Sequence, residues 1–169
     1  MRSAATFLFT AALALGAGPA AARDSLGMFE SWGAFRDPGV QAGGPRCYAI
    51  ATAEPSRLRR DYQPYAAIGT WPRQNQRNQV HFRLSRRLAP GGRIVLSIGD
   101  QRFMLTGGGG DAWAADRRMD AAVVAAMRSA RSMTVSARGA VGGSFSNSWV
   151  LAGAATAMDA AAIGCAQLR

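Results

Sequence analysis

The fold is decided by the stretch RIVLSIGDQRFMLT at positions 93–106. It consists of two apolar, β-rich runs that are separated only by Gly99 and Asp100. A two-residue connection that contains glycine favours a tight turn between antiparallel strands. Because side chains alternate between the two faces of a strand, each run has one apolar face. These apolar faces are formed by Ile94, Leu96, Ile98, Phe103 and Leu105. The stretch therefore predicts a β-hairpin with one buried side.

Similar patterns on either side of the hairpin predict further strands and two helices. Alternation of apolar and polar residues, or a short β-rich run, predicts strands at 47–51, 80–85, 133–136 and 148–151. Apolar residues at helical spacing predict a short helix over about 120–130, with Asp120 as its N-terminal cap. The alanine-rich segment 154–166 predicts a terminal helix.

The remaining segments are less regular. Glycine and proline at 38–45 predict a loop, whereas the aromatic residues of 29–35 fit either a short strand or a turn of helix. We interpret the polar, arginine-rich segment 56–78 as a long surface connection with a short strand at 66–69. The four consecutive glycines 107–110 predict the end of the sheet.

Five or more short strands with only short helices favour a mostly β protein, an antiparallel β-sandwich. The chain has 169 residues, a length typical of one domain, and no internal repeat occurs. Hydrophobic residues make up 49% of the chain, which excludes a disordered basic tail. We expect a single β-sandwich domain over 23–169.

Residues 1–22 have the pattern of a secretory signal peptide. Arg2 is followed by the mostly apolar run 4–17 and then by small residues, before charge returns at Arg23. We expect cleavage after Ala22 and export to the periplasm or the extracellular space. An uncleaved membrane anchor is the alternative, but the apolar run is shorter than the about 20 residues that a spanning helix needs. No later segment is long enough either, so we do not expect a membrane-spanning protein.

The chain contains two cysteines, Cys47 and Cys165. An even number of cysteines in an exported protein favours a disulfide, because thiols are oxidised outside the cytoplasm. The alternative is a reactive or metal-binding thiol. A thiol nucleophile needs a base, for which only His81 is present, and a structural zinc site needs four ligands. We predict a Cys47–Cys165 disulfide.

The chain is strongly basic and contains no lysine. Its 20 basic residues are all arginine, and 10 acidic residues leave a net charge of +10. Four arginines of the hairpin region could share an exposed face that binds anions: Arg83, Arg87, Arg93 and Arg102. An exported protein meets few nucleic acids, so the expected partners are lipopolysaccharide phosphates, acidic glycans or a host or envelope protein. The alternative is that GC-rich codon usage places arginine where lysine usually stands.

The sequence predicts no catalytic, cofactor or metal site. The acidic residues are scattered, and the pair Asp116 and Asp120 is better explained by helix capping and solvation than by acid–base catalysis. The single histidine, His81, is expected to face solvent on the polar side of its strand. The run Gly142-Gly143-Ser144-Phe145 begins like the G-x-S-x-G nucleophile elbow of hydrolases, but Ser146 stands where the last glycine should be. The glycines 107–110 lack the lysine that follows in a phosphate-binding loop.

The order of these segments resembles that of the invasion-associated locus B family of exported bacterial proteins. The resemblance covers roughly 29–165 and is formed by Cys47-Tyr48-Ala49, Gln79-Val80, 99–105, 111–114, 123–127, 132–139, 149–153 and the helix that ends near Cys165. It departs from the family at Trp149, where relatives often have tyrosine, at Asn147, where they often have an acidic residue, and at the four glycines. The resemblance implies an immunoglobulin-like β-sandwich, export and no known catalysis.

We therefore expect an exported, non-enzymatic interaction module that is associated with the envelope or secreted, with host-cell or envelope contact as the role that the resemblance implies. A periplasmic structural or stress-related protein without a specific ligand is one alternative. An enzyme with an unrecognised site is another. The sandwich fold does not distinguish among these, because it supports many functions.

Overall fold

The computed structural model describes residues 23–38, 44–166 and 168. The predicted signal peptide, 1–22, lies outside the described residues. In chain order the elements are β1 (Asp24–Phe29), β2 (Trp32–Asp37), β3 (Arg46–Thr52), β4 (Tyr65–Trp71), the 3-10 turn η1 (Pro72–Gln74), β5 (Gln76–Arg83), β6 (Ile94–Ile98), β7 (Gln101–Gly108), β8 (Asp111–Trp113), α1 (Arg117–Met127), β9 (Ser132–Arg138), β10 (Ser144–Val150) and α2 (Ala154–Ala166). The mostly β class predicted from the sequence is confirmed.

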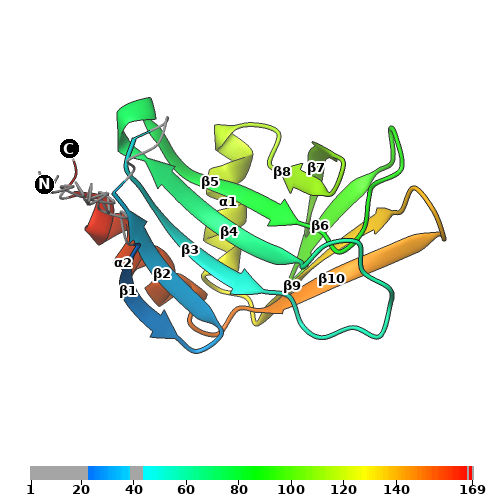
Figure 1. Ribbon diagram of the computed structural model, residues 1–169, viewed down its shortest axis with the longest axis horizontal. Coiled ribbons are helices and arrows are strands. Elements are labelled where there is room, and N and C mark those ends of the chain that lie inside the picture. Colours follow the sequence, from blue (N-terminus) through cyan, green and yellow to red (C-terminus); the bar gives the residue numbers. More distant parts are fainter. Residues whose placement is uncertain (1–22, 39–43, 167, 169) are drawn as a thin grey trace, which may run out of the picture.

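All ten strands join in one antiparallel sheet with the order β1-β2-β3-β4-β5-β8-β7-β6-β9-β10. The sheet changes direction at β7, because Gln101–Leu105 pair with β6 whereas Thr106–Gly108 pair with β8. Strands β1–β5 and β8 form one layer, seen from the front in Figure 1, and β6, β7, β9 and β10 form the other. This strand order does not confirm the immunoglobulin-like topology.

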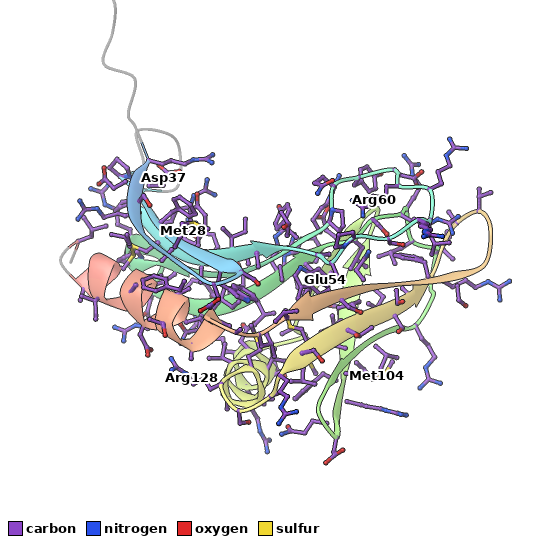
Figure 2. All side chains as sticks on the ribbon, turned by 90° about the horizontal axis from the view of Figure 1, so that it is seen from below. Met28, Asp37, Glu54, Arg60, Met104 and Arg128 are labelled. Carbon is purple, nitrogen blue, oxygen red and sulfur yellow. A yellow bond between two sulfur atoms is a disulfide. The ribbon has the colours of Figure 1, made fainter. Side chains whose placement is uncertain are left out.

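The two helices lie against the inner side of the first layer, as Figure 2 shows. Helix α2 packs on β1–β4, and alanines contribute many of the buried side chains on both surfaces. Ala34, Ala49 and Ala66 are fully buried on the strands, and Ala157 is fully buried on the helix. Gly153 has a φ of +84°, and a side chain there would overlap the carbonyl oxygen of Phe29. Small residues therefore allow the helix to approach the strands closely.

The second layer packs against the inner side of the first through large side chains. The rings of Phe82 on β5 and Trp149 on β10 lie 5.4 Å apart and are both buried. The Trp32 indole N–H donates to the Val150 carbonyl at 2.9 Å. The side-chain oxygen of the buried Asn147 accepts a hydrogen bond from the Ser85 backbone N–H at 2.9 Å. Asn147, one of the departures from the family pattern, thus has a structural role here.

Several predicted elements have the predicted bounds, and others differ. The hairpin of β6 and β7 is present, with its apolar side chains paired across the strands, and the terminal helix spans Ala154–Ala166. The segment 29–35, left open between strand and helix, forms parts of β1 and β2. The four glycines do not end the sheet, because two of them belong to β7 and two form its turn to β8.

Two predictions need correction. The segment 56–78 is not mainly a surface connection, because the whole of β4 and the start of β5 lie within it. The short strand predicted at 66–69 is present as the centre of β4, which is longer by one residue at its start and two at its end. Asp120 does not cap α1, since the helix begins at Arg117 and its cap is Asp116, which accepts a hydrogen bond from the Met119 N–H at 2.8 Å. Asp120 is instead buried and accepts a hydrogen bond from the Val80 N–H at 2.8 Å.

Candidate functional site

The outward face of β3, β4, β5 and β8 is the candidate site. In Figure 2 both helices lie on the opposite side of this layer. Strand register places cross-strand neighbours in rows: Tyr48, Gly69 and Gln79 form one, and Ile50, Ala67, His81 and Trp113 the next. The floor of the face is therefore made of small and aliphatic side chains, and larger aromatic ones stand around it.

A shallow hollow of about 300 Å³ is lined by this face. Its lining residues are Arg23, Arg46, Tyr48, Ile50, Tyr65, Ala67, Gly69, Trp71, Gln79 and His81. A Cβ at Gly69 would lie 2.5 Å from Cη2 of Trp71, so the indole ring lies directly over the glycine. The absence of a side chain at Gly69 thus allows the Trp71 ring to lie over the strand, where it lines the hollow.

A second group of rings stands at the β5–β8 side of the hollow. The imidazole of His81 is stacked on the Trp113 ring, with centroids 5.2 Å apart, and meets Tyr65 edge-on at 5.5 Å. Burial raises the pKa of Tyr65, and the negative charge of Asp111 raises this pKa further. The Tyr65 hydroxyl therefore keeps its proton at neutral pH and can donate a hydrogen bond.

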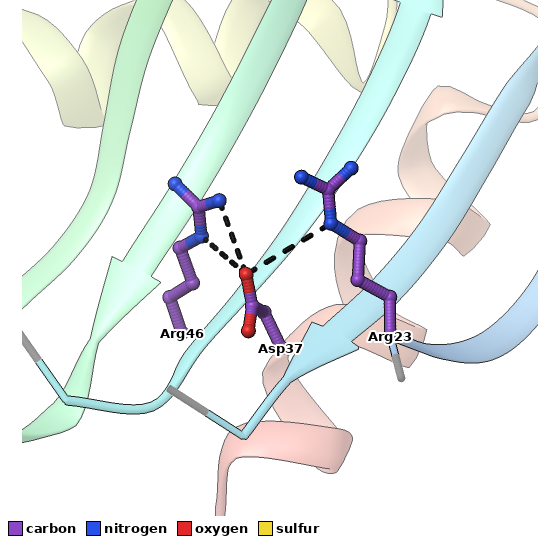
Figure 3. Close-up of polar contacts among 3 residues, drawn as sticks. All are labelled: Arg23, Asp37 and Arg46. Atoms are coloured by element: carbon purple, nitrogen blue, oxygen red, sulfur yellow. Dashed lines mark hydrogen bonds and ion pairs between the residues drawn. The ribbon is translucent and has the colours of Figure 1, made fainter. Parts of the chain in front are cut away.

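Guanidinium groups mark the end of the hollow near β2. Figure 3 shows Arg23 and Arg46 on either side of Asp37. The Nε and one terminal nitrogen of Arg46 donate to Asp37 Oδ2 at 3.2 and 3.1 Å, and Arg23 Nε lies 3.9 Å from the same oxygen. The Arg46 guanidinium also lies 5.4 Å from the centre of the Tyr48 ring. Two cations thus surround one carboxylate, and arginine has further N–H groups with which to bind an anion.

The opposite end of the face carries His81, Asp111 and Arg83. His81 Nε2 lies 3.0 Å from Asp111 Oδ1, and Arg83 pairs with the other carboxylate oxygen. Ring contacts and this pairing leave the His81 side chain only 24% exposed, which is less than a freely solvated histidine would show. In the described part of the chain, no hydroxyl or thiol is hydrogen-bonded to His81. The pair therefore fixes the imidazole ring but supplies no nucleophile.

The four arginines of the predicted anion-binding surface lie on different elements. Arg93 and Arg102 are on the outward side of the β6–β7 hairpin, where Arg93 reaches Met104 at 4.0 Å. Arg83 is on the candidate site, paired with Asp111. Arg87 follows β5, and its backbone N–H donates to Asp61 at 3.0 Å. The first two therefore share the outward side of one hairpin but lie toward its opposite ends, and the other two lie elsewhere.

The predicted disulfide is present in the structure. The Cys47 and Cys165 sulfur atoms are bonded, with Cα atoms 5.6 Å apart, and the pair joins the inner side of β3 to the last turn of α2. In the described residues, no group of three or more His, Cys, Asp and Glu side chains could hold a metal ion. None of the described helices is long and apolar enough to cross a membrane.

Comparison with known proteins found no match to a family model. No curated protein and no solved structure matches either. The resemblance to the invasion-associated locus B family therefore rests on the sequence pattern alone.

The aromatic residues of the site were not predicted, although the sequence contains a signal for one of them. A glycine stands two positions before an aromatic residue at Gly27-Phe29, Gly33-Phe35, Gly69-Trp71 and Gly143-Phe145. In the first three cases, where both residues belong to one strand, a Cβ on the glycine would lie within 2.8 Å of the ring, whereas a Cβ on Gly143, in the β9–β10 turn, would meet nothing within 4 Å. Positions two apart on a strand share a face, so within a strand this spacing indicates an aromatic ring that lies over the glycine.

Proposed function

We propose that this chain is an exported, non-enzymatic binding protein whose outward sheet face binds an acidic glycan. The observation that carries the proposal is the Trp71 ring, which lies over Gly69 and lines a hollow that has two arginines at one end. The negative face of an aromatic ring attracts the C–H groups of a sugar ring, as it attracts other positive edges. Arginine binds carboxylate or phosphate through a planar pair of N–H groups.

The size and polarity of the hollow support this ligand class. A volume of about 300 Å³ is at the lower end for small-molecule sites, and its open shape suits a few units of a longer chain. Tyr65 and Gln79 add hydrogen-bonding groups for hydroxyls at the same surface. These features support an envelope polysaccharide more than a flat protein surface.

Export and family membership are parts of the same proposal. The signal-peptide pattern of 1–22 supports export, and the Cys47–Cys165 disulfide suits an oxidising compartment. The sequence resemblance supports membership of the invasion-associated locus B family. Such membership would imply that the β-sandwich is immunoglobulin-like. The periplasm or the cell exterior is the location that agrees with an acidic envelope glycan as ligand.

The proposal can be tested by calorimetric titration with two ligands of the same length. One is oligogalacturonate, an acidic sugar chain, and the other is a neutral maltooligosaccharide. We expect the acidic chain to bind more tightly. Trp71→Ala should weaken binding about tenfold, because a stacked ring contributes about 0.5–1.5 kcal/mol beyond area burial. Arg46→Gln should reduce the preference for the acidic chain.

Met104→Ala is the matched control, because it removes an exposed apolar side chain, 44% accessible, from another outward part of the sheet. Affinity should not change in this variant. Absence of saccharide binding, or equal affinity in the Trp71→Ala variant, would contradict the proposal. Tight binding of a single-stranded oligonucleotide in place of the glycan would instead indicate a nucleic-acid platform, since stacked aromatic rings and arginines also serve that ligand.

A further inference from the structure

One end of the molecule is formed by three segments that follow or precede strands: 53–64, 84–92 and 139–143. Figures 1 and 2 both place the loops of these segments side by side, at the end opposite α2. Backbone hydrogen bonds hold them together, since the Asp61 N–H donates to the Ser85 carbonyl at 2.7 Å and the Ala140 N–H to the Arg87 carbonyl at 2.8 Å. We call this end, formed by the three segments, the basic end.

Two apolar side chains project from the basic end into solvent. Leu58 is 55% exposed in the first loop, and Val141 is 80% exposed in the β9–β10 turn. Both stand at the tips of loops, where packing does not require an apolar residue. Transfer of such exposed aliphatic side chains into an apolar phase is favourable, because it removes apolar surface from water.

Arginines surround these two tips. The three segments contain five of them, Arg57, Arg59, Arg60, Arg86 and Arg87, against two acidic residues, Glu54 and Asp61. Within the described ranges 23–38, 44–166 and 168, none of the five is within ion-pair distance of a carboxylate. Their positive charges are therefore not neutralised within the described fold.

Arg86 connects the charge directly to an apolar tip. Its guanidinium donates to the carbonyl oxygens of Val141 and Gly142, the latter at 3.3 Å, and lies 5.8 Å from the centre of the Phe145 ring. These contacts hold a cation beside the exposed Val141 side chain. Leu58 also lies next to basic residues, since Arg57 and Arg59 are its two neighbours in the sequence.

We propose that the basic end docks on the surface of an anionic lipid bilayer. Basic side chains are attracted to negatively charged headgroups, and nearby apolar side chains enter the boundary between headgroups and acyl chains. A soluble polyanion would use the arginines but gain nothing from Leu58 and Val141, so the pairing of the two features favours a bilayer. None of the residues that line the hollow belongs to the basic end, so the surface and the glycan can be bound together.

Sedimentation with lipid vesicles tests the proposal. The processed chain, from residue 23 onward, holds all ten strands and both helices and avoids the apolar run of 4–17. We expect it to sediment with phosphatidylcholine vesicles that contain phosphatidylglycerol, to stay in solution with pure phosphatidylcholine, and to be released by high salt. Arg57→Gln with Arg59→Gln should weaken binding about 25-fold, at about 1 kcal/mol for each arginine at the surface.

Arg93→Gln with Arg102→Gln removes the same charge from the β6–β7 face and is the matched control. Its partition should stay close to that of the unmodified chain. Equal losses in the two double variants would overturn the proposal, because net charge alone would then explain binding.

Leu58→Ser with Val141→Ser keeps every charge and should also weaken sedimentation. If this variant sediments normally, and soluble heparin competes equally for both proteins, the basic end binds polyanions and not bilayers. Circular dichroism of each variant checks that the fold is intact.

Discussion

Removal of the Cys47–Cys165 disulfide should destabilise the protein by about 3–5 kcal/mol. The bond closes a loop with a sequence separation of 118 residues, and the loop-entropy model gives about 5 kcal/mol for that length at 25 °C, while measured values are more often about 2–4. The double variant Cys47→Ala with Cys165→Ala avoids leaving a free thiol in the core. Both positions are buried, at 0% and 3% exposure, so the lost sulfur atoms add a small packing penalty.

The position of the bond makes α2 the most sensitive element. Most of the buried residues of the helix are alanine or glycine, and such small residues bury little apolar area each against β1–β4. The disulfide ties its last turn to β3, whereas its first turn follows directly from β10. Loss of the bond should therefore release the C-terminal half of α2 before the sheet unfolds.

Urea unfolding followed by circular dichroism measures the first effect, and amide hydrogen exchange measures the second. We expect a lower midpoint and a steeper slope, because the unfolded chain without the cross-link is less compact and exposes more surface, together with faster exchange in α2 than in β3–β5. The unmodified protein with a reducing agent should behave like the double variant, and the double variant should not respond to that agent. A change in unfolding free energy below about 1 kcal/mol, or unchanged exchange in α2, would refute the reasoning.

Two further predictions concern buried polar groups. Asp120→Asn should stabilise the protein more at neutral than at acid pH. Burial raises the pKa of Asp120, so the folded state favours the protonated carboxyl. The unmodified protein therefore loses stability as the pH rises from roughly 4 through the raised pKa. The asparagine side chain does not titrate in this pH range, and its oxygen can still accept the hydrogen bond from the Val80 N–H on β5. Urea unfolding of both proteins at several pH values measures the difference. Asn147→Ala should cost about 1–3 kcal/mol, because the Ser85 N–H loses its buried partner, and thermal unfolding measures the loss. Asn147→Asp should be destabilising at neutral pH because it buries a charge.

Exposed substitutions serve as controls for both predictions. Asp100→Asn lies in the exposed β6–β7 turn and should not change the pH dependence of unfolding. Ser146→Ala, on the outward side of β10 and next to Asn147, should leave the melting temperature nearly unchanged. A stability difference between the Asp120→Asn variant and the unmodified protein that stays constant with pH would contradict the first prediction. An Asn147→Ala variant as stable as the unmodified protein would contradict the second.

Local pattern accounts for the parts of the fold that were predicted. The alternation in 93–106 gave β6 and β7, and their pairing followed because only two residues join them. The alanine-rich 154–166 gave α2, and a chain with two cysteines has one intramolecular pairing. Failures occurred where the local signal was weak: within 56–78 only the centre of β4 was predicted, and the four glycines concealed the β7–β8 hairpin.

The sequence by itself determined the mostly β class, the central hairpin, the terminal helix and the cysteine pair, because each depends on neighbouring residues or on simple counting. Only the tertiary structure decided the candidate site. Tyr48, Trp71, His81 and Trp113 come from four strands, and the register of those strands places them on one face. The same is true of the basic end, whose three segments meet because β3, β5 and β9 end there and β4 and β10 begin there. Strand partners and register depend on contacts between distant residues, and a periodic pattern within one strand carries no information about which strand lies beside it.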